Sequence, residues 1–192
     1  MENENTKKKV PFKDTMAGPT VILLIICLVI SAALAITYQV TKPKIDQINK
    51  ETADAARMAV LPKADKFTET DGKLPDGVTE YYVADNGAGE VATCQYKSFG
   101  GTITVMVGMD SDGKITGVQV TDHDDTPGVG TKAMDSSYLK KQYVGVTETE
   151  KAANIRNDSK IDQVTGATVS SNAIYQCVNE ALDAYQSLGG AK

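Results

Sequence analysis

The chain has 192 residues, of which 41% are hydrophobic, and its 25 Asp and Glu outnumber its 20 Lys and Arg to give a formal net charge of −5. This acidic balance argues against a nucleic-acid-binding protein, because such proteins neutralise phosphates with an excess of Lys and Arg. The hydrophobic content argues against a disordered chain and predicts a folded core.

An uncharged apolar stretch runs from Thr15 to Thr41 near the N-terminus. A run of about 20 apolar residues matches the hydrocarbon thickness of a bilayer, so we predict a transmembrane helix over residues 19–41. Residues 1–18 should lie in the cytoplasm, because lysines gather on the cytoplasmic side of a membrane span. The lysines that precede the span are Lys7, Lys8, Lys9 and Lys13. These features predict a single-pass protein of the cell membrane, in contact with lipid, whose C-terminal domain is extracytoplasmic.

A cleaved signal peptide is the alternative interpretation of this segment. Ala33-Leu34-Ala35 resembles the small-residue site at which such peptides are cut. Uncharged sequence continues past Ala35 to Thr41, which favours an anchor. In both cases the domain that follows lies outside the cytoplasm.

Residues 42–78 predict a helical spacer followed by a loop. Pro43 to Leu61 carries apolar residues at helical spacing, and Pro62 should end the helix. Lys63 to Gly77 is rich in charge, Gly and Pro, which is typical of a loop.

Residues 79–192, a typical size for one domain, predict an α+β fold with an antiparallel sheet and flanking helices, preceded by the single N-terminal transmembrane helix. Short apolar or alternating segments separated by turns predict the strands. The predicted strands are Tyr81–Ala84, Val91–Tyr96, Gly101–Met109 and Lys114–Thr121. Helices are predicted at Lys132–Tyr143, with Met134, Tyr138 and Leu139 as core candidates, and from Val169 onward.

The C-terminal helix follows a turn of small residues, Thr165-Gly166-Ala167-Thr168. Thr168 and Ser170 lie where N-cap hydroxyls are expected, and the first N–H groups of a helix have no intrahelical partner. Such a turn can hold an anion, since those donors and the positive end of the helix dipole face the ligand. An ordinary capped helix without a ligand is the alternative interpretation.

Two motifs resemble a known family. Asp162-x-x-Thr165-Gly166-Ala167-Thr168 is similar to the Asp-x-x-Ser/Thr-Gly-Ala-Thr flavinylation motif of FMN-binding domains. These domains occur in the G subunit of the Rnf ion-translocating electron transport complex and in the C subunit of the sodium-pumping NADH:quinone oxidoreductase. Asp125-Thr126-Pro127-Gly128-Val129-Gly130 is similar to the family's Glu-Thr-Pro-Gly-Leu-Gly loop, with Asp125 in place of Glu and Val129 in place of Leu. The resemblance covers roughly residues 85 to 190 and includes the N-terminal span.

The resemblance implies a covalent FMN, joined to the Thr168 hydroxyl as a phosphoester by a flavin transferase during maturation. It also implies that the flavin contacts both motifs. The implied cofactor-binding residues are Asp162, Thr165, Gly166, Ala167, Ser170, Thr126, Pro127, Gly128 and Gly130.

The function implied is that of a membrane-anchored flavoprotein, which relays electrons within an ion-translocating ferredoxin:NAD oxidoreductase of the Rnf type. Its partners would be the other membrane subunits, which would hold the NADH and ferredoxin sites. The chain has no motif for hydrolytic chemistry and no metal-ligand spacing, which favours a non-catalytic, electron-carrying subunit. Alternatives are a C-type subunit of the quinone-reducing enzyme, a stand-alone extracellular flavoprotein, and a structural or sensing domain without flavin.

The single histidine and two of the three cysteines belong to the predicted domain. His123 is expected to be a polar turn residue, with contact to the flavin as the alternative. Cys94 and Cys177 are expected to be buried free thiols. A disulfide between them is the alternative, because the domain should lie outside the cytoplasm.

Overall fold

The computed structural model describes residues 17–70 and 73–188. The chain divides into two compact units after Glu51. Helix α1 (Ala17–Val60) starts in the first unit and ends in the second. Among the described residues it is the helix that is long and apolar enough to cross a membrane, in agreement with the predicted span. Two separate helices were expected here, but α1 continues through Pro43, since a proline removes one helical hydrogen bond and can bend a helix without ending it.

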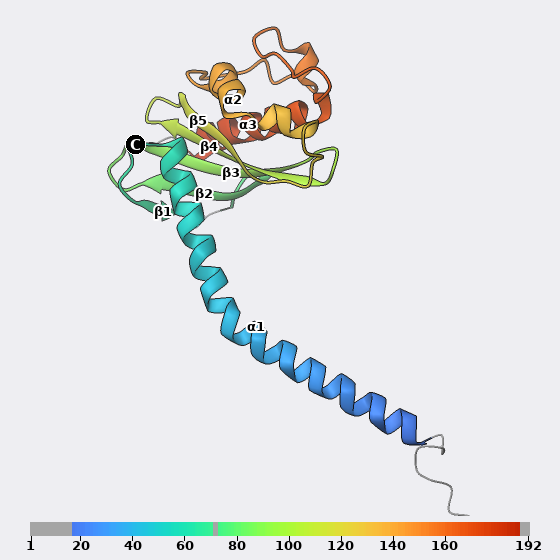
Figure 1. The fold of residues 1–192 in the computed structure, drawn as a ribbon. Coiled ribbons are helices and arrows are strands. Elements are labelled where there is room, and N and C mark those ends of the chain that lie inside the picture. The colour runs from blue at the N-terminus through green and yellow to red at the C-terminus, as the bar shows by residue number, and fades with distance from the viewer. Residues whose placement is uncertain (1–16, 71–72, 189–192) are drawn as a thin grey trace, which may run out of the picture. The chain divides into compact units, whose positions relative to one another are not determined.

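The second unit contains a five-stranded antiparallel sheet in which each strand pairs with the next along the chain (Figure 1). Its strands are β1 (Phe67–Glu69), β2 (Val78–Ala84), β3 (Gly89–Lys97), β4 (Thr102–Asp110) and β5 (Ile115–Asp122). The four predicted strands are confirmed with slightly shifted ends. Strand β1 lies in the segment predicted to be only loop; three residues are too few to give a recognisable alternating pattern.

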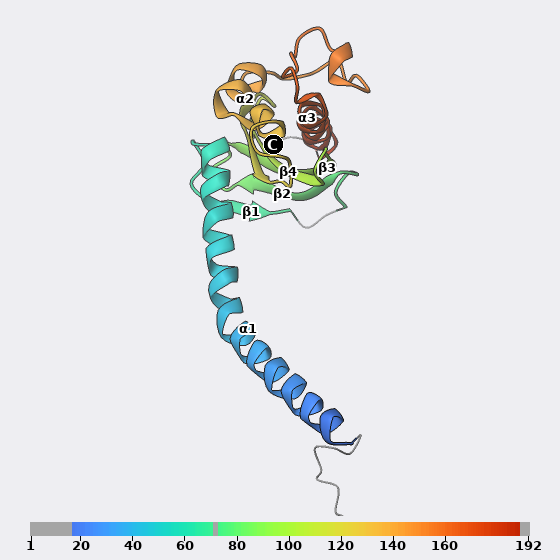
Figure 2. The same ribbon diagram turned by 45° about the vertical axis from the view of Figure 1, so that its right-hand side comes forward.

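One face of the sheet carries the main core. The alternation predicted for β4 is confirmed, since Ile103, Val105, Val107 and Met109 are all buried in this core. Helix α3 (Thr168–Leu188) covers this face, and α2 (Ser136–Tyr143) contributes Leu139 and Tyr143 (Figure 2). Cys94 and Cys177 are buried here as free thiols, as predicted.

The segment before α2 differs from its prediction. The expected single helix over Lys132–Tyr143 is instead a 3-10 helix, Gly130–Met134, followed by α2. Asp135 separates them because its backbone is extended and its carboxylate caps α2, accepting hydrogen bonds from the N–H groups of Ser137 and Tyr138. A second 3-10 helix, Ile155–Asn157, lies between α2 and α3.

A smaller core lies on the other face of the sheet, where the end of α1 packs. Val60 and Leu61 are buried there with Val91 and Met106. The Thr116 hydroxyl donates a hydrogen bond of 2.5 Å to the carbonyl of Val60. This end of the helix was expected to be a spacer, but it is packed as part of the domain.

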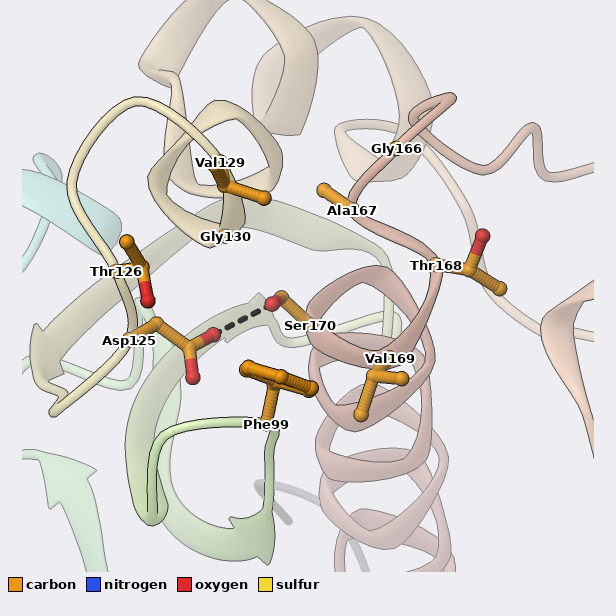
Figure 3. A pocket seen from close by; sticks show the side chains of 10 residues that line it. All are labelled: Phe99, Asp125, Thr126, Val129, Gly130, Gly166, Ala167, Thr168, Val169 and Ser170. Atoms are coloured by element: carbon orange, nitrogen blue, oxygen red, sulfur yellow. Dashed lines mark hydrogen bonds between the residues drawn. The ribbon is translucent and has the colours of Figure 1, made fainter.

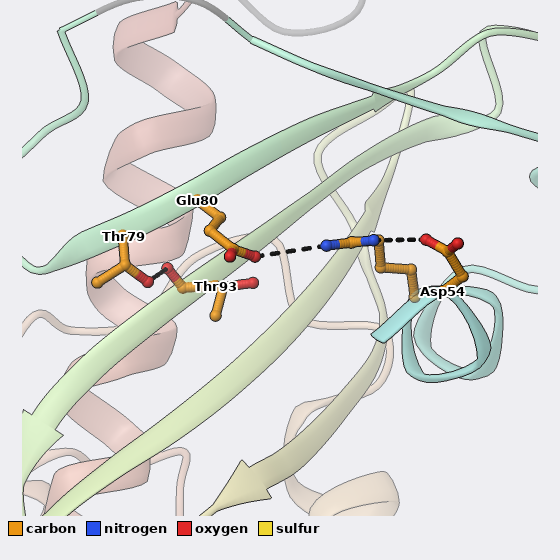
Figure 4. Close-up of polar contacts among 5 residues, drawn as sticks. Asp54, Thr79, Glu80 and Thr93 are labelled. Atoms are coloured by element: carbon orange, nitrogen blue, oxygen red, sulfur yellow. Dashed lines mark hydrogen bonds and ion pairs between the residues drawn. The ribbon is translucent and has the colours of Figure 1, made fainter. Parts of the chain in front are cut away.

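Arg57 joins the end of α1 to strand β2 through charge and stacking. Its guanidinium contacts Asp54 at 2.6 Å and Glu80 at 3.4 Å (Figure 4). The same group lies over the ring of Tyr82, 3.7 Å from the ring centre, a favourable cation–π arrangement. The buried Arg57 therefore holds the last turns of α1 against the sheet.

Candidate functional site

Both motifs identified in the sequence contribute to one open cavity of about 380 Å³. Three segments meet there: the turn between β3 and β4, the loop after β5, and the start of α3 (Figure 3). The residues that line the cavity are Phe99, Asp125, Thr126, Val129, Gly130, Gly166, Ala167, Thr168, Val169 and Ser170.

The turn that precedes α3 is held by its own hydrogen bonds. The N–H of Ala167 donates to the carbonyl of Val164 at 3.0 Å, and Gly166 has a positive φ of 84° within this turn. Glycine adopts that left-handed conformation without the penalty that a side chain would bring. The Ser171 hydroxyl accepts a hydrogen bond of 3.1 Å from the N–H of Val164, which ties the turn to the helix.

The N-cap prediction for Thr168 and Ser170 is wrong, because α3 already begins at Thr168. The first helical hydrogen bond runs from the N–H of Ser171 to the carbonyl of Ala167. An N-cap residue must precede the first turn, and here Ala167 does, with no hydroxyl to offer. The N–H groups of Thr168, Val169 and Ser170 therefore open the helix without intrahelical partners.

Thr168 lies at the edge of the cavity, and its side chain points away from Asp125 (Figure 3). The residue is half-buried. Within the described part of the chain its hydroxyl has no hydrogen-bond partner. The hydroxyl is thus available for reaction, next to the N-terminal end of a helix, where a phosphate is favoured.

Asp125 binds all three segments of the site together. Its Oδ2 accepts hydrogen bonds from the Ser98 hydroxyl at 2.6 Å and from the Ser170 hydroxyl at 2.5 Å. Its Oδ1 accepts one of 2.7 Å from the N–H of Gly100. The residue is only 3% exposed, so this carboxylate depends on those donors in place of water.

The donors also decide the charge of Asp125. Burial by itself raises the pKa of this carboxyl, but the hydrogen bonds from Ser170, Ser98 and Gly100 favour the ionised form more strongly and hold the pKa below its ordinary value. Asp125 is therefore a buried carboxylate anion beside the cavity at neutral pH.

Gly130 packs closely against this pair. An added Cβ at Gly130 would lie 2.7 Å from Oδ2 of Asp125 and 2.8 Å from the Ser170 hydroxyl oxygen. Only a residue without a side chain lets the loop approach the start of α3 so closely. Gly128, by contrast, has φ +77° and open space around its missing Cβ.

The structure brings six of the ten predicted site residues to the cavity: Thr126, Gly130, Gly166, Ala167, Thr168 and Ser170. The other four, Asp162, Thr165, Pro127 and Gly128, do not line it. The backbone of Asp162 is tied to α2, because its carbonyl accepts a hydrogen bond of 2.6 Å from the Tyr138 hydroxyl. His123 is exposed and is also outside the lining.

Sequence reasoning did not select four residues that line the cavity: Phe99, Asp125, Val129 and Val169. Asp125 and Val129 were noted only as departures from the family's loop, although their place in that motif could have nominated them. Phe99 lies in a turn between strands, and its sequence gives no signal that the turn reaches α3.

The cavity has apolar side chains at its opening, polar side chains deeper inside, and the first residues of α3 on one side. Phe99, Val129 and Val169 supply apolar surface, while Asp125 and Ser170 lie deeper and are buried. The volume falls in the range of small-molecule sites. This arrangement fits a flat aromatic ligand that carries a phosphate.

Comparison with known proteins gives the same assignment. A model of the FMN-binding domain family matches residues 98–183. The chain is similar to the G subunit of the Na⁺-translocating ferredoxin:NAD⁺ oxidoreductase complex of Acetobacterium woodii, with 31% identity over 87% of this chain and 90% of that protein. It is also similar to the G subunit of the proton-translocating ferredoxin:NAD⁺ oxidoreductase complex of Clostridium ljungdahlii, with 28% identity over 88% and 91%. The G subunit of the ion-translocating oxidoreductase complex of Methanosarcina acetivorans is 29% identical over 85% and 90%.

Proposed function

The chain belongs to the family of FMN-binding G subunits of ion-translocating oxidoreductase complexes, and from that premise we propose that Thr168 carries FMN through a phosphoester bond. The observation that supports this most directly is the cavity, in which the Thr168 turn and the Thr126–Gly130 loop meet although they are far apart in the sequence.

As a member of this family the chain is a flavoprotein subunit of an ion-translocating ferredoxin:NAD oxidoreductase, the Rnf complex. FMN, when bound, supplies the one- and two-electron chemistry of such a subunit, while the protein positions it and tunes its potential. The other subunits of the complex are its partners. In this proposal they contain the sites for ferredoxin and NAD, and this domain passes electrons between them.

The residues of the cavity fit the two ends of the cofactor. The phosphate would lie at the start of α3, where the N–H groups of Thr168, Val169 and Ser170 open the helix. The ring would lie in the apolar mouth of the cavity. A covalent bond retains the cofactor where free FMN would otherwise diffuse away after dissociation.

The predicted membrane anchor determines on which side of the membrane each part of the chain would lie. Residues 19–41 would span the cell membrane, surrounded by lipid, with residues 1–18 in the cytoplasm. Residues 42–78 would lead from the membrane to the domain, with their second half already packed as part of it, and residues 79–192 would hold the flavin outside the cytoplasm. A flavin transferase would act there on the half-buried Thr168 at the start of α3.

The test is the mass of the full-length protein purified from its native membrane. The wild type should carry one FMN less one water, on the peptide that contains Thr168. Thr168→Ala should lose the adduct and remain folded, because a substitution at a partly exposed position usually changes stability by less than about 1 kcal/mol. Thr147→Ala, an exposed threonine outside both motifs and outside the cavity lining, should keep the adduct. Unmodified Thr168 in the native protein would overturn the proposal.

A further inference from the structure

Phe99 is 76% exposed, more than any other large hydrophobic side chain described beyond α1. The next two in exposure are Val129 at 51% and Val169 at 50%. All three line the mouth of the same cavity. Apolar surface is therefore concentrated where the cofactor site opens, and a cluster of this kind marks a place that a ligand or partner covers.

The turn that carries Phe99 is held firmly on both sides of the ring. The Ser98 hydroxyl and the N–H of Gly100 donate to the two oxygens of Asp125. The N–H of Ser98 also donates to the carbonyl of Gly101 at 2.7 Å, which closes the turn. Asp125 thus accepts hydrogen bonds from the residue before Phe99 and from the residue after it.

Close backbone packing fixes the same turn. An added Cβ at Gly100 would lie 2.1 Å from the carbonyl oxygen of Asp124, so only glycine fits at this position. The backbone of the turn is therefore fixed beside the cavity, and the Phe99 side chain that it carries lines the opening.

The opposite side of the cavity is aliphatic. Phe99 lies on one side of the space, and Val129 with Ala167 lies on the other (Figure 3). An aromatic face opposite small aliphatic side chains suits a flat ring system, because aromatic rings pack favourably in offset stacks.

We propose that Phe99 is the aromatic wall against which the isoalloxazine ring of FMN packs, and that Asp125 and Ser98 are positioning residues that hold it there. This inference rests on the proposed function, since it concerns the flavin carried by Thr168. It assigns the exposed ring to the cofactor and not to a docking partner.

The experiment compares flavinylated full-length variants whose mass first confirms the adduct. Phe99→Trp should lower flavin fluorescence about twofold or more, because a larger, electron-rich indole against the isoalloxazine quenches its emission. Phe99→Ala should shift the midpoint potential, because water would replace the aromatic ring beside the isoalloxazine. Val144→Ala, an exposed valine that does not line this cavity, should leave both at wild-type values.

The positioning role of Ser98 is tested by comparing two substitutions at that residue. Ser98→Ala removes one of the two hydrogen bonds from the turn to Asp125 and should shift the midpoint potential in the same direction as Phe99→Ala. Ser98→Thr keeps the hydroxyl and should restore the wild-type value.

Wild-type fluorescence and potential in both Phe99 variants would overturn the inference and leave the ring as a docking surface. A missing adduct in the wild type would instead overturn the proposed function, so the two failures are distinguishable.

Discussion

The Ser170 hydroxyl donates a hydrogen bond of 2.5 Å to Asp125, 45 residues earlier in the chain. The same carboxylate accepts hydrogen bonds from Ser98 and from the N–H of Gly100. One buried charge therefore joins the start of α3 to the β3–β4 turn and to the loop after β5. A change at Asp125 should disturb every wall of the cavity together.

Asp125→Ala should lower the free energy of unfolding by about 3 kcal/mol, since a buried donor that loses its acceptor costs about 1–3 kcal/mol. Asp125→Asn should cost only about 1 kcal/mol. The amide oxygen can accept from Gly100, and the amide NH₂ can donate to the two serine hydroxyls. Chemical unfolding of the three proteins at pH 7 measures the difference, and equal losses in both variants would contradict this account.

The pH dependence supplies a control for the charge. The folded-state pKa of Asp125 lies below its ordinary value of 3.8, so its contribution is present above that value and is lost as the pH falls through the folded-state pKa. Wild type should therefore lose stability on acidification below about pH 4 more steeply than Asp125→Asn.

Gly130→Ala should destabilise the domain by about 1–3 kcal/mol and change the visible spectrum of the flavin. The added methyl would overlap the Asp125–Ser170 pair, and overpacking of a tight contact has costs of this size. Gly128→Ala is the matched control in the same loop. It carries a backbone penalty of about 1 kcal/mol for its positive φ, but it should leave the flavin spectrum unchanged. A spectrum altered only by Gly128→Ala would move the flavin away from Gly130.

Four of the five strands and the buried face of β4 could be predicted, because alternation and turn residues are local signals. Ile103 to Met109 is an uninterrupted example. Two other features could not be predicted. Helix α1 continues through Pro43, and Val60 packs against the sheet. A proline usually indicates the end of a helix. Gly108 and Gly117 allow the backbone of Val60 to pack closely on the sheet, but a glycine in a strand does not indicate which segment packs there.

Some residues of the candidate site could also be predicted from the sequence, and others could not. The Thr168 turn and the Thr126–Gly130 loop are motifs and could be recognised in the sequence. Phe99 could not, because its place depends on hydrogen bonds from Ser98 and Gly100 to a residue in another loop. The sequence also does not distinguish Ser170 from Ser171. The Ser170 hydroxyl donates to Asp125, whereas the Ser171 hydroxyl accepts from the N–H of Val164.

Arg57→Ala should lower the free energy of unfolding by about 1–2 kcal/mol and expose the end of α1 to proteolysis. Arg57 is buried, but Asp54 and Glu80 are each nearly half exposed, so the loss should fall below that of a fully buried ion pair. Arg57→Lys keeps the charge but not the planar group over Tyr82, and it should recover only part of the stability. Full recovery by lysine would show that stacking contributes nothing.

Glu180→Gln should make the domain more stable than wild type above pH 7. Burial, followed by the nearby charge of Asp183, raises the pKa of Glu180 to about 7, and one carboxylate oxygen is buried without a partner among the described residues. A raised folded-state pKa gives stability that is complete below the unfolded value of 4.5 and is lost as the pH rises through about 7. Melting temperatures at pH 5.5 and 8.5 should therefore differ more for wild type than for the variant. Equal pH dependence would show that Glu180 is solvated in the folded state.

The orientation of the domain can be determined from the reactivity of single cysteines in intact cells. Ser111 is an exposed residue of the β4–β5 turn whose carbonyl accepts a hydrogen bond from Tyr185, a contact that Ser111→Cys leaves in place. The native Cys94 and Cys177 are buried, so they should not react in the folded protein. Cys27 lies within the predicted span, where an impermeant reagent should not reach it. The lysines before the apolar segment predict a cytoplasmic N-terminus. Ser111→Cys should therefore react with an impermeant maleimide before lysis, whereas Thr6→Cys should react only afterwards. The reverse pattern would place the flavin domain in the cytoplasm.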